Sequence, residues 1–366
     1  LPDSFPAKPA FAWSKSLSGR ALAGVAATSK YVLVADREAD DTVDAFFCLD
    51  AATGAEKWAI RYKTAGSLDY GNSPRATPLV VGDKVYLYGA FGHLHCVRLS
   101  DGELLWKKNL RRAFDVKEPS VWGFCSTPLL ADGKLIVNPG APDASIVALD
   151  PENGEVLWKT AGGPAAFASF ILAELGGVRQ LVGYDAASAG GWDPATGRRL
   201  WTLKPQKPKD FNVPTPLVWK DKLLLASENN GLRAHGFKAG GVIDPAPAAT
   251  FAPLAPDSHT PVIVGDRLFG IWHSMFCVDL AKGLSQVWEN EDSAFSGYGA
   301  LIASSDKVLA LNQEGELLLF AADSADGKPL ARLRLFENER GVLAHPALVG
   351  RRLYVRNSSG IHALDL

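Results

Sequence analysis

Residues 149–158 read LDPENGEVLW, and this pattern of an Asp, a Gly and a closing Trp recurs along the chain. The related segments are LDAATGAEKW (49–58), LSDGELLW (99–106), WDPATGRRLW (192–201) and the more divergent VDLAKGLSQVW (278–288). In chain order, the closing tryptophans of all five segments stand 48, 52, 43 and 87 residues apart. A period of roughly 40 to 50 residues indicates a propeller or a solenoid. The gap of 87 therefore represents two repeats with an eroded middle copy.

A second marker gives the number of repeats. A short turn between two β-rich runs stands before each motif, as in TPLVVGDKVYLYG (77–89) and PALVGRRLYVR (346–356). Eight such turns occur, at Ser29-Lys30, Gly82-Asp83, Asp132-Gly133, Gly176-Gly177, Lys220-Asp221, Gly265-Asp266, Ser305-Asp306 and Gly350-Arg351. Runs of this kind indicate half-buried antiparallel hairpins. Each repeat is therefore predicted to contain four strands, which make one propeller blade.

The two ends of the chain complete the last repeat. That repeat stops at IHALDL (361–366), after its third strand, and the N-terminal AFAWSKSLSG (10–19) can supply the missing outermost strand. Pairing the ends would remove open sheet edges that invite aggregation. We therefore predict an all-β, eight-bladed β-propeller of four-stranded antiparallel blades, closed by its N-terminal strand. Residues 1–10 are expected to be a leader or linker, and residues 11–366 a single propeller domain.

The motif tryptophans have a structural explanation. In the motif the Asp and Thr cap the turn between the third and fourth strands, and the Gly takes the positive-φ position that a tight turn needs. The Trp can then lie flat between two blades and bury on the order of 200 Å². We predict this blade-docking role for Trp13, Trp58, Trp106, Trp158, Trp201 and Trp288.

Composition excludes several classes of protein. The chain has 366 residues, of which 47% are hydrophobic and 21% charged, and its formal net charge is −2. Scattered Lys and Arg with this net charge give no attraction for nucleic acid. No stretch approaches the roughly 18 apolar residues of a membrane span. The chain begins with Leu1 and a proline-bearing segment, so we expect an exported protein, periplasmic or associated with the cell envelope.

The four cysteines could form two disulfides in an oxidising compartment. However, Cys48, Cys96 and Cys277 occupy the same position in three different repeats. A propeller would hold them farther apart than the roughly 5.5 Å between the Cα atoms of a disulfide. We therefore expect these cysteines and Cys125 to be free thiols that pack as small hydrophobic side chains.

The blade signature of Leu-Asp, Thr-Gly and a docking Trp, as in LDAATGAEKW and WDPATGRRLW, resembles that of the pyrroloquinoline-quinone-like (PQQ-like) repeat propellers. Segments such as SHTPVIVGDRLFG (258–270) are similar to short, exported bacterial propellers of the BamB type. The superfamily also contains quinoprotein dehydrogenases, which hold PQQ and calcium beside a vicinal Cys-Cys pair. This chain is much shorter and has no adjacent cysteines. No cofactor is therefore expected, and PQQ with calcium is kept as an alternative.

In such propellers the loop that leads into each innermost strand lines one mouth of the central channel. Here these loops are rich in aromatic and polar residues. A ring of aromatic side chains with two imidazoles suits a planar ligand, a sugar or a peptide segment. The alternative is that the same residues plug and seal the channel. The candidate ligand-binding residues are Arg20, Tyr70, Asn72, Arg75, Trp122, Phe124, Phe167, Phe211, Asn212, His259, Tyr298 and His345.

The sequence contains no recognisable metal or catalytic motif. His259 and His345 come from different blades and would need a third ligand to form a metal site, which no local spacing such as HxH or HExxH supports, so we expect hydrogen-bonded histidines of the channel wall. His93 and His95 form an HxH on a predicted connection, for which a surface role is expected. The acidic run DREADDTVD (36–44) lacks the Gly and the spacing of a calcium loop, so we expect a solvated loop. GxSxG, Walker and GxGxxG motifs are also absent.

Three functions remain open on these grounds. The first is a non-catalytic scaffold that binds a protein, peptide or ligand at the bacterial cell envelope. The second is a quinone-dependent alcohol or sugar dehydrogenase. The third is a glycan or small-molecule binding module that uses the residues of the channel mouth.

Overall fold

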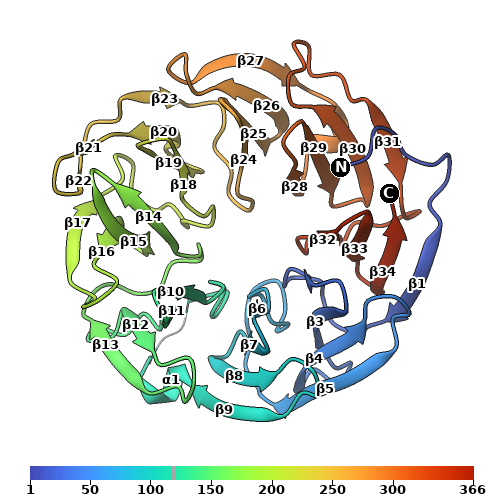
Figure 1. The fold of residues 1–366 in the computed structure, drawn as a ribbon, viewed down its shortest axis with the longest axis horizontal. Coiled ribbons are helices and arrows are strands. Elements are labelled where there is room, and N and C mark those ends of the chain that lie inside the picture. The colour runs from blue at the N-terminus through green and yellow to red at the C-terminus, as the bar shows by residue number, and fades with distance from the viewer. Residues whose placement is uncertain (118–119) are drawn as a thin grey trace.

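The structure is a computed structural model that describes residues 1–117 and 120–366. Eight four-stranded antiparallel sheets stand radially around a central channel (Figure 1). The strands of each sheet follow one another from the channel outward, and the predicted eight-bladed propeller is confirmed. None of the helices in the described ranges is long and apolar enough to cross a membrane.

The strands of the eight blades are short. Blade 1 contains β2 (Ala26–Ala27), β3 (Tyr31–Arg37), β4 (Val43–Asp50) and β5 (Glu56–Lys63), and blade 2 contains β6 (Leu79–Val81), β7 (Lys84–Tyr88), β8 (His93–Arg98) and β9 (Leu104–Asn109). Blade 3 contains β10 (Leu129–Ala131), β11 (Lys134–Val137), β12 (Ile146–Leu149) and β13 (Val156–Thr160), and blade 4 contains β14 (Ile171–Leu175), β15 (Val178–Asp185), β16 (Ser188–Trp192) and β17 (Arg199–Leu203). Blade 5 contains β18 (Leu217–Trp219), β19 (Lys222–Ser227), β20 (Gly231–His235) and β23 (Ala249–Phe251), and blade 6 contains β24 (Val262–Val264), β25 (Arg267–Trp272), β26 (Ser274–Asp279) and β27 (Ser285–Asn290). Blade 7 contains β28 (Gly299–Ala303), β29 (Lys307–Asn312), β30 (Glu316–Ala321) and β31 (Ala331–Arg334), and blade 8 contains β32 (Ala347–Val349), β33 (Arg352–Arg356), β34 (Gly360–Asp365) and β1 (Phe11–Ser16). Outside the blades, the structure contains the hairpin β21 (Phe237–Lys238) and β22 (Val242–Ile243), the single-turn helix α1 (Leu110–Ala113) and the 3₁₀ turn η1 (Ser293–Phe295).

The core lies between neighbouring blades. The two middle strands of each blade are covered on both faces, so they carry nearly continuous apolar runs, such as LLLA in β19. Between blades 1 and 2, for example, Leu33 and Phe46 pack with Val85 and Leu87 in one buried cluster. This arrangement repeats around the ring, and each blade depends on its two neighbours for burial.

All four cysteines are free, as expected. Cys48, Cys96 and Cys277 are buried in the third strands of different blades. Burial raises the pKa of each of these thiols to about 12. They therefore pack as neutral, unreactive side chains.

The N-terminal strand closes the ring, which confirms the prediction. β1 pairs antiparallel with β34, with Trp13 opposite Ala363, and forms the outermost strand of blade 8 (Figure 1). A buried ion pair reinforces this junction, because Arg356 of blade 8 lies 3.2 Å from Asp36 of blade 1. Of the preceding residues, Leu1 and Phe5 pack against the apolar cluster shared by blades 7 and 8.

Five of the motif tryptophans make the same contact with the next blade. Each indole N–H donates to a backbone oxygen at 2.9–3.1 Å, and each ring covers the glycine of the next motif. The pairs are Trp13 on Gly54, Trp58 on Gly102, Trp106 on Gly154, Trp158 on Gly197 and Trp288 on Gly327. The glycine thus provides the surface on which the preceding blade's tryptophan lies.

Trp201 is different because blade 5 lacks this turn. A long connection carrying β21 and β22 replaces it, and Phe237 of this hairpin packs edge-on against Trp201 at 5.7 Å between ring centres. The indole N–H of Trp201 donates instead to the side-chain oxygen of Gln180 at 2.5 Å. The inserted hairpin therefore takes the place of the missing glycine turn.

Candidate functional site

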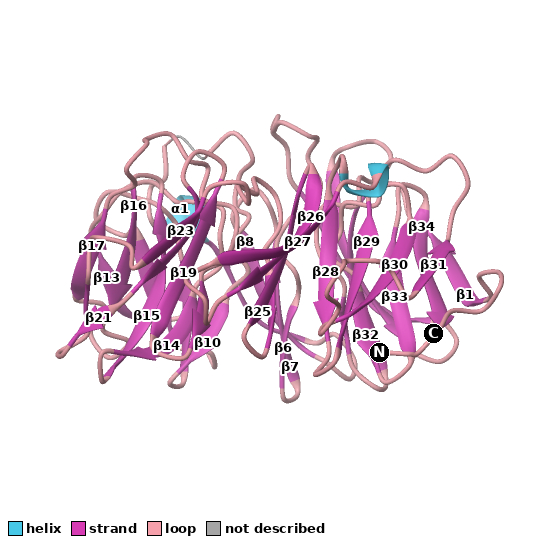
Figure 2. Cartoon of the chain, turned by 90° about the horizontal axis from the view of Figure 1, so that it is seen from above, coloured by secondary structure: helices cyan, strands magenta, loops and turns pink. Residues whose placement is uncertain are grey.

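The loops between blades and the loops between second and third strands share one face of the ring, the upper face in Figure 2. All twelve candidate residues lie on connections between blades. The ring architecture therefore gathers loops that are far apart in sequence around one mouth of the channel.

Five of the candidate aromatic residues come together there, and we call them the aromatic mouth: Tyr70, Trp122, Phe167, Phe211 and Tyr298. The Trp122 ring is central, at 4.4 Å from Phe167 and 4.8 Å from Phe211 between ring centres. Tyr70 meets Trp122 edge-on at 6.2 Å. The hydroxyl oxygens of Tyr70 and Tyr298 lie 3.4 Å apart, which joins loops 228 residues apart in sequence.

A cavity of about 380 Å³ opens at the aromatic mouth. Besides the five aromatic side chains, its described lining contains Arg75, Cys125 and Asp257, with apolar residues such as Leu22 and Val342. Desolvation is the main cause that raises the pKa of the Cys125 thiol, to about 12. The cavity therefore offers apolar and aromatic walls with one cation and one carboxylate, and it has no activated thiol.

Arg75 shapes the loop that presents Tyr70. Its guanidinium donates to the backbone oxygens of Ser73 at 2.9 Å, Asp69 at 2.6 Å and Gly71 at 2.8 Å. Burial lowers the pKa of Arg75. Tyr70 itself has φ of +64°, an uncommon conformation for a residue with a side chain. The loop is thus wrapped around the arginine, and the tyrosine is held outward.

Asn72 also serves this loop. Its side-chain oxygen accepts from the backbone N–H of Leu68 at 3.0 Å, and its amide donates to Asp41 at 2.6 Å. These contacts link the Tyr70 loop to the loop between the second and third strands of blade 1.

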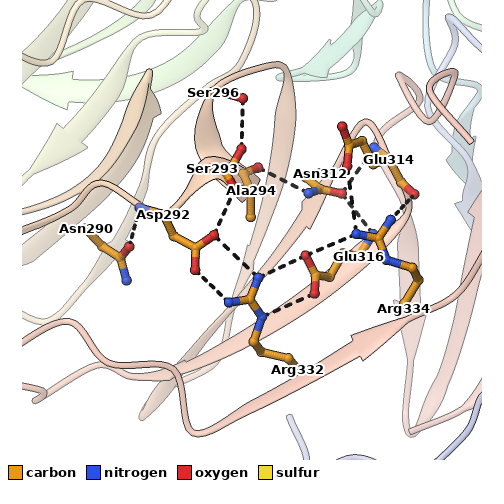
Figure 3. A network of polar contacts seen from close by, with 10 residues as sticks. All are labelled: Asn290, Asp292, Ser293, Ala294, Ser296, Asn312, Glu314, Glu316, Arg332 and Arg334. Carbon is orange, nitrogen blue, oxygen red and sulfur yellow. Dashed lines mark hydrogen bonds and ion pairs between the residues drawn. The ribbon is translucent and has the colours of Figure 1, made fainter.

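The loop that carries Tyr298 is held by an ion-pair network (Figure 3). Arg332 lies between Asp292 at 2.6 Å and Glu316 at 3.1 Å. Asp292 caps η1, because its carboxylate accepts from the backbone N–H of Ala294. That hydrogen bond, together with Arg332, lowers the pKa of Asp292. Hydrogen bonding to Tyr70 and burial raise the pKa of Tyr298 to about 12, so its hydroxyl stays protonated.

The remaining candidates do not line this cavity. Phe124 is buried against Tyr88 at 5.5 Å, and the buried Asn212 reaches the backbone oxygen of Asp185. Arg20 is exposed beside Gly71. These three residues shape the surrounding structure instead.

The two candidate histidines contact backbone groups. Nε2 of His259 accepts from the N–H of Ile271 at 2.8 Å, and burial lowers the pKa of His259 to about 4. His259 lines a second cavity of about 250 Å³ with Trp272 and Gln313. The ring nitrogens of His345 lie 2.9 and 3.1 Å from the carbonyl oxygens of Pro346 and Leu301. Within residues 1–117 and 120–366, no three His, Cys, Asp or Glu side chains gather as metal ligands.

Sequence reasoning missed a belt of hydroxyl groups just before the innermost strands. The backbone N–H of each of the first four members donates to the hydroxyl of its counterpart in the next blade, at 2.9–3.3 Å. The members, in order, are Thr77, Thr127, Ser169, Thr215 and Thr260. The signal was the repeated Thr-Pro at 77–78, 127–128, 215–216 and 260–261. The belt fixes the spacing of blades 2 to 6 at the channel.

Two expectations about other polar residues were wrong. His93 and His95 lie on strand β8, where both rings pack against Tyr62 and His95 is buried, because the strand extends further than predicted. In the acidic run, only the middle is solvated. Asp36 and Asp44 are buried at strand ends, where Asp36 pairs with Arg356 and Asp44 with Arg37 at 2.8 Å.

Comparison with known proteins places this fold. A family model described as outer membrane protein assembly factor BamB matches residues 49–239, just over half of the chain. The chain belongs to this family. The resemblance to PQQ-like propellers inferred from the repeat motif is thereby confirmed. No curated protein matches the sequence.

Solved structures agree with the BamB family fold. BamB from Moraxella catarrhalis is similar with a TM-score of 0.66 and 16% identity, over 96% of this chain and 98% of that one. Quinohemoprotein alcohol dehydrogenase from Comamonas testosteroni gives 0.65 and 14%, over 97% and 76%. The computationally designed protein Ika8 gives 0.68 and 12%, over 96% and 98%. At such identities the likeness concerns the fold alone.

Proposed function

We propose that this chain is a non-catalytic propeller of the cell envelope that holds an aromatic or apolar segment of a partner protein in its aromatic mouth. The observation that carries the proposal is the convergence of aromatic side chains from five separate connections. Tyr70 remains 49% and Phe211 47% exposed. Residues that only seal a channel would bury these rings. Exposed aromatic clusters are instead typical anchors of protein interfaces.

Family membership supports the cellular setting. The family description refers to outer-membrane protein assembly. A role beside other proteins in the envelope, reached by export, is in keeping with that description. We infer a periplasmic or envelope-associated location for this chain.

The experiment is retrieval of a partner from envelope extract with a tagged chain, its Trp122→Ala variant and a matched control, Leu330→Ala. Leu330 is 52% exposed directly before β31, away from the aromatic mouth. We expect one discrete species with the wild type and the control, and its loss with Trp122→Ala. Retention of this species by the Trp122→Ala variant would contradict the proposal, and a thermal midpoint equal to that of the wild type would show that a loss is not caused by unfolding.

A small-molecule or glycan ligand is a second candidate, favoured by the cavity volume. About 380 Å³ lies within the roughly 300–1,000 Å³ of typical ligand sites. Substituting Trp122 and Tyr298 with Ala should abolish binding of such a ligand while the fold persists. Survival of the affinity would mean that these rings only pack.

A quinone-dependent dehydrogenase fits these residues poorly. Calcium takes six to eight oxygen ligands, usually several of them carboxylates. Among the described residues that line the cavity, only Asp257 carries a carboxylate. We therefore expect no dye reduction with alcohols or sugars after addition of PQQ and calcium. Turnover under these conditions would overturn the non-catalytic assignment.

A further inference from the structure

A third and larger cavity lies on the upper face, away from the channel, between blades 1 and 2. Its volume is about 780 Å³. Lys63 and Thr64 at the end of β5 form one side, and Arg111 and Arg112 of α1 form the other. His93 at the start of β8 lies between them. We call this site the basic pocket.

The charges of the basic pocket are unbalanced. Among the described residues, Lys63, Arg111 and Arg112 have no carboxylate within 4.0 Å. Among the described lining residues Asp115 carries the one carboxylate, and Lys117 already pairs with it at 2.5 Å. Elsewhere on the chain, Arg98 for example pairs with Asp101 at 3.0 Å. The basic pocket therefore carries positive charge, although the net charge of the whole chain is −2.

Arg111 and Arg112 lie on the single turn of α1, which hydrogen bonds and a buried side chain hold in place. Asn109 caps α1 by accepting from the backbone N–H of Arg112 at 3.0 Å, and Leu110 between them is fully buried. The Arg111 guanidinium lies 3.4 Å from the backbone oxygens of Val116 and Lys117. These contacts limit the side-chain entropy that would be lost when an anion binds.

A buried donor or acceptor completes the site. Nδ1 of His93 is buried and has no hydrogen-bond partner among the described residues. Its ring packs on Tyr62 at 4.8 Å between ring centres, which fixes its orientation. Burial, and then the positive charges of Arg112 and Lys107, lower the pKa of His93. The imidazole therefore lies in the positive potential of these neighbouring side chains.

We propose that the basic pocket binds a small, soluble phosphate ester, with Arg111, Arg112 and Lys63 on the phosphate. Guanidinium groups match phosphate oxygens through paired, charge-assisted hydrogen bonds. A single inorganic phosphate would fill little of 780 Å³, so the remaining volume suits the hydroxyl-bearing body of a sugar phosphate beside Thr64 and Asn109. This site is distinct from the aromatic mouth and does not depend on its role.

The test compares glucose 6-phosphate with glucose by isothermal titration calorimetry, using the full chain. We expect saturable binding of the phosphate ester, none of glucose, and a weaker affinity at higher salt. The double variant Arg111→Gln, Arg112→Gln should weaken binding at least tenfold. The double variant Lys282→Gln, Lys328→Gln removes the same charge from exposed turns between third and fourth strands and should bind like the wild type.

Three further measurements keep the result unambiguous. Equal thermal midpoints of the two double variants would show that both are folded, and a Trp122→Ala variant should bind the phosphate ester normally. The third measurement is binding of the chain to vesicles that contain phosphatidylglycerol, with phosphatidylcholine vesicles as the control. Absence of glucose 6-phosphate binding, equal affinity in both double variants, or binding to phosphatidylglycerol vesicles alone would each overturn the proposal.

Discussion

At the scale of single residues, the motif glycine has two roles. Gly154 has φ of +73°, which the tight turn requires, and a Cβ added to it would lie 2.7 Å from the Trp106 ring. Gly133 has nearly the same φ, +72°, but open space around its Cα. The two glycines of blade 3 therefore separate backbone strain from the loss of blade docking.

We predict that Gly154→Ala lowers the free energy of unfolding by about 1–3 kcal/mol more than Gly133→Ala. Both variants carry the cost of a side chain at positive φ, about 1–2 kcal/mol. Only Gly154→Ala also displaces the Trp106 ring. Urea unfolding followed by tryptophan fluorescence measures the difference. Equal losses in the two variants would show that the ring contact contributes nothing.

Buried histidines predict a pH dependence of stability. Burial lowers the pKa of His95, His259 and His362 to about 4 each, against about 6.5 in an unfolded chain. Each depressed pKa contributes stability above pH 6.5, where the imidazole is neutral in both states. As pH falls from 6.5 to 4, the unfolded chain binds protons that the folded chain does not, and this stability is lost.

His95 gives the cleanest test because it is only 6% exposed. We expect His95→Gln to reduce the slope of unfolding free energy against pH between 6.5 and 5 by about 1 kcal/mol per pH unit. Carboxylates remain largely ionised in this window, so their titration interferes little. Urea unfolding at several pH values gives the slope, and an unchanged slope would refute the assignment.

At the scale of elements, β1 decides whether the ring is closed. It covers the edge of β34 and places Trp13, which is 9% exposed, on Gly54 of blade 1. Without β1, blade 8 would have three strands and an open edge. The Arg356–Asp36 pair and a few hydrogen bonds, such as that from the Tyr354 hydroxyl to the backbone oxygen of Ala51 at 3.2 Å, would then link the two blades.

We predict that deleting residues 1–16 lowers the thermal midpoint by roughly 5–10 °C, through the lost burial of Trp13 and the lost strand pairing. Deleting residues 1–10 keeps β1 and should cost much less. Differential scanning calorimetry of the two truncated chains makes the comparison. If both deletions gave the same midpoint, closure by β1 would be irrelevant to stability.

Some strands and loops of the propeller could be predicted from the sequence, and others could not. The Asp–Gly–Trp motif and the hairpin turns predicted eight blades because each repeat must bury its faces on the next. They did not predict the hairpin β21–β22 beneath Trp201, because its residues replace a motif rather than follow one. Likewise, Trp122 and Phe211 were predicted to lie at the mouth because they precede innermost strands. The same reasoning could not distinguish these lining residues from the buried Phe124 and Asn212. Those two side chains turn inward because of local loop conformation, which the repeat pattern does not encode.

At the scale of the whole molecule, the ring assigns different roles to its two faces. The upper face carries the aromatic mouth and the basic pocket, and the opposite face carries the chain ends (Figure 2). Blades 2 to 6 are linked at the channel by the hydroxyl belt, which gives the loops above them a common frame. A rigid ring with side chains presented on one face suits binding, because the surface is already organised before a partner arrives.

The central claim is that the aromatic mouth contacts a partner protein. Photo-crosslinking from position 211 tests it most directly, with a benzoylphenylalanine in place of Phe211 and, as control, of Val242 on the inserted hairpin. Both native side chains are 47% exposed. We predict one discrete crosslinked product in envelope extract from position 211, none from position 242, and loss of the product when Trp122→Ala is added. Equal products from both positions, or a product that persists in the Trp122→Ala background, would contradict the account.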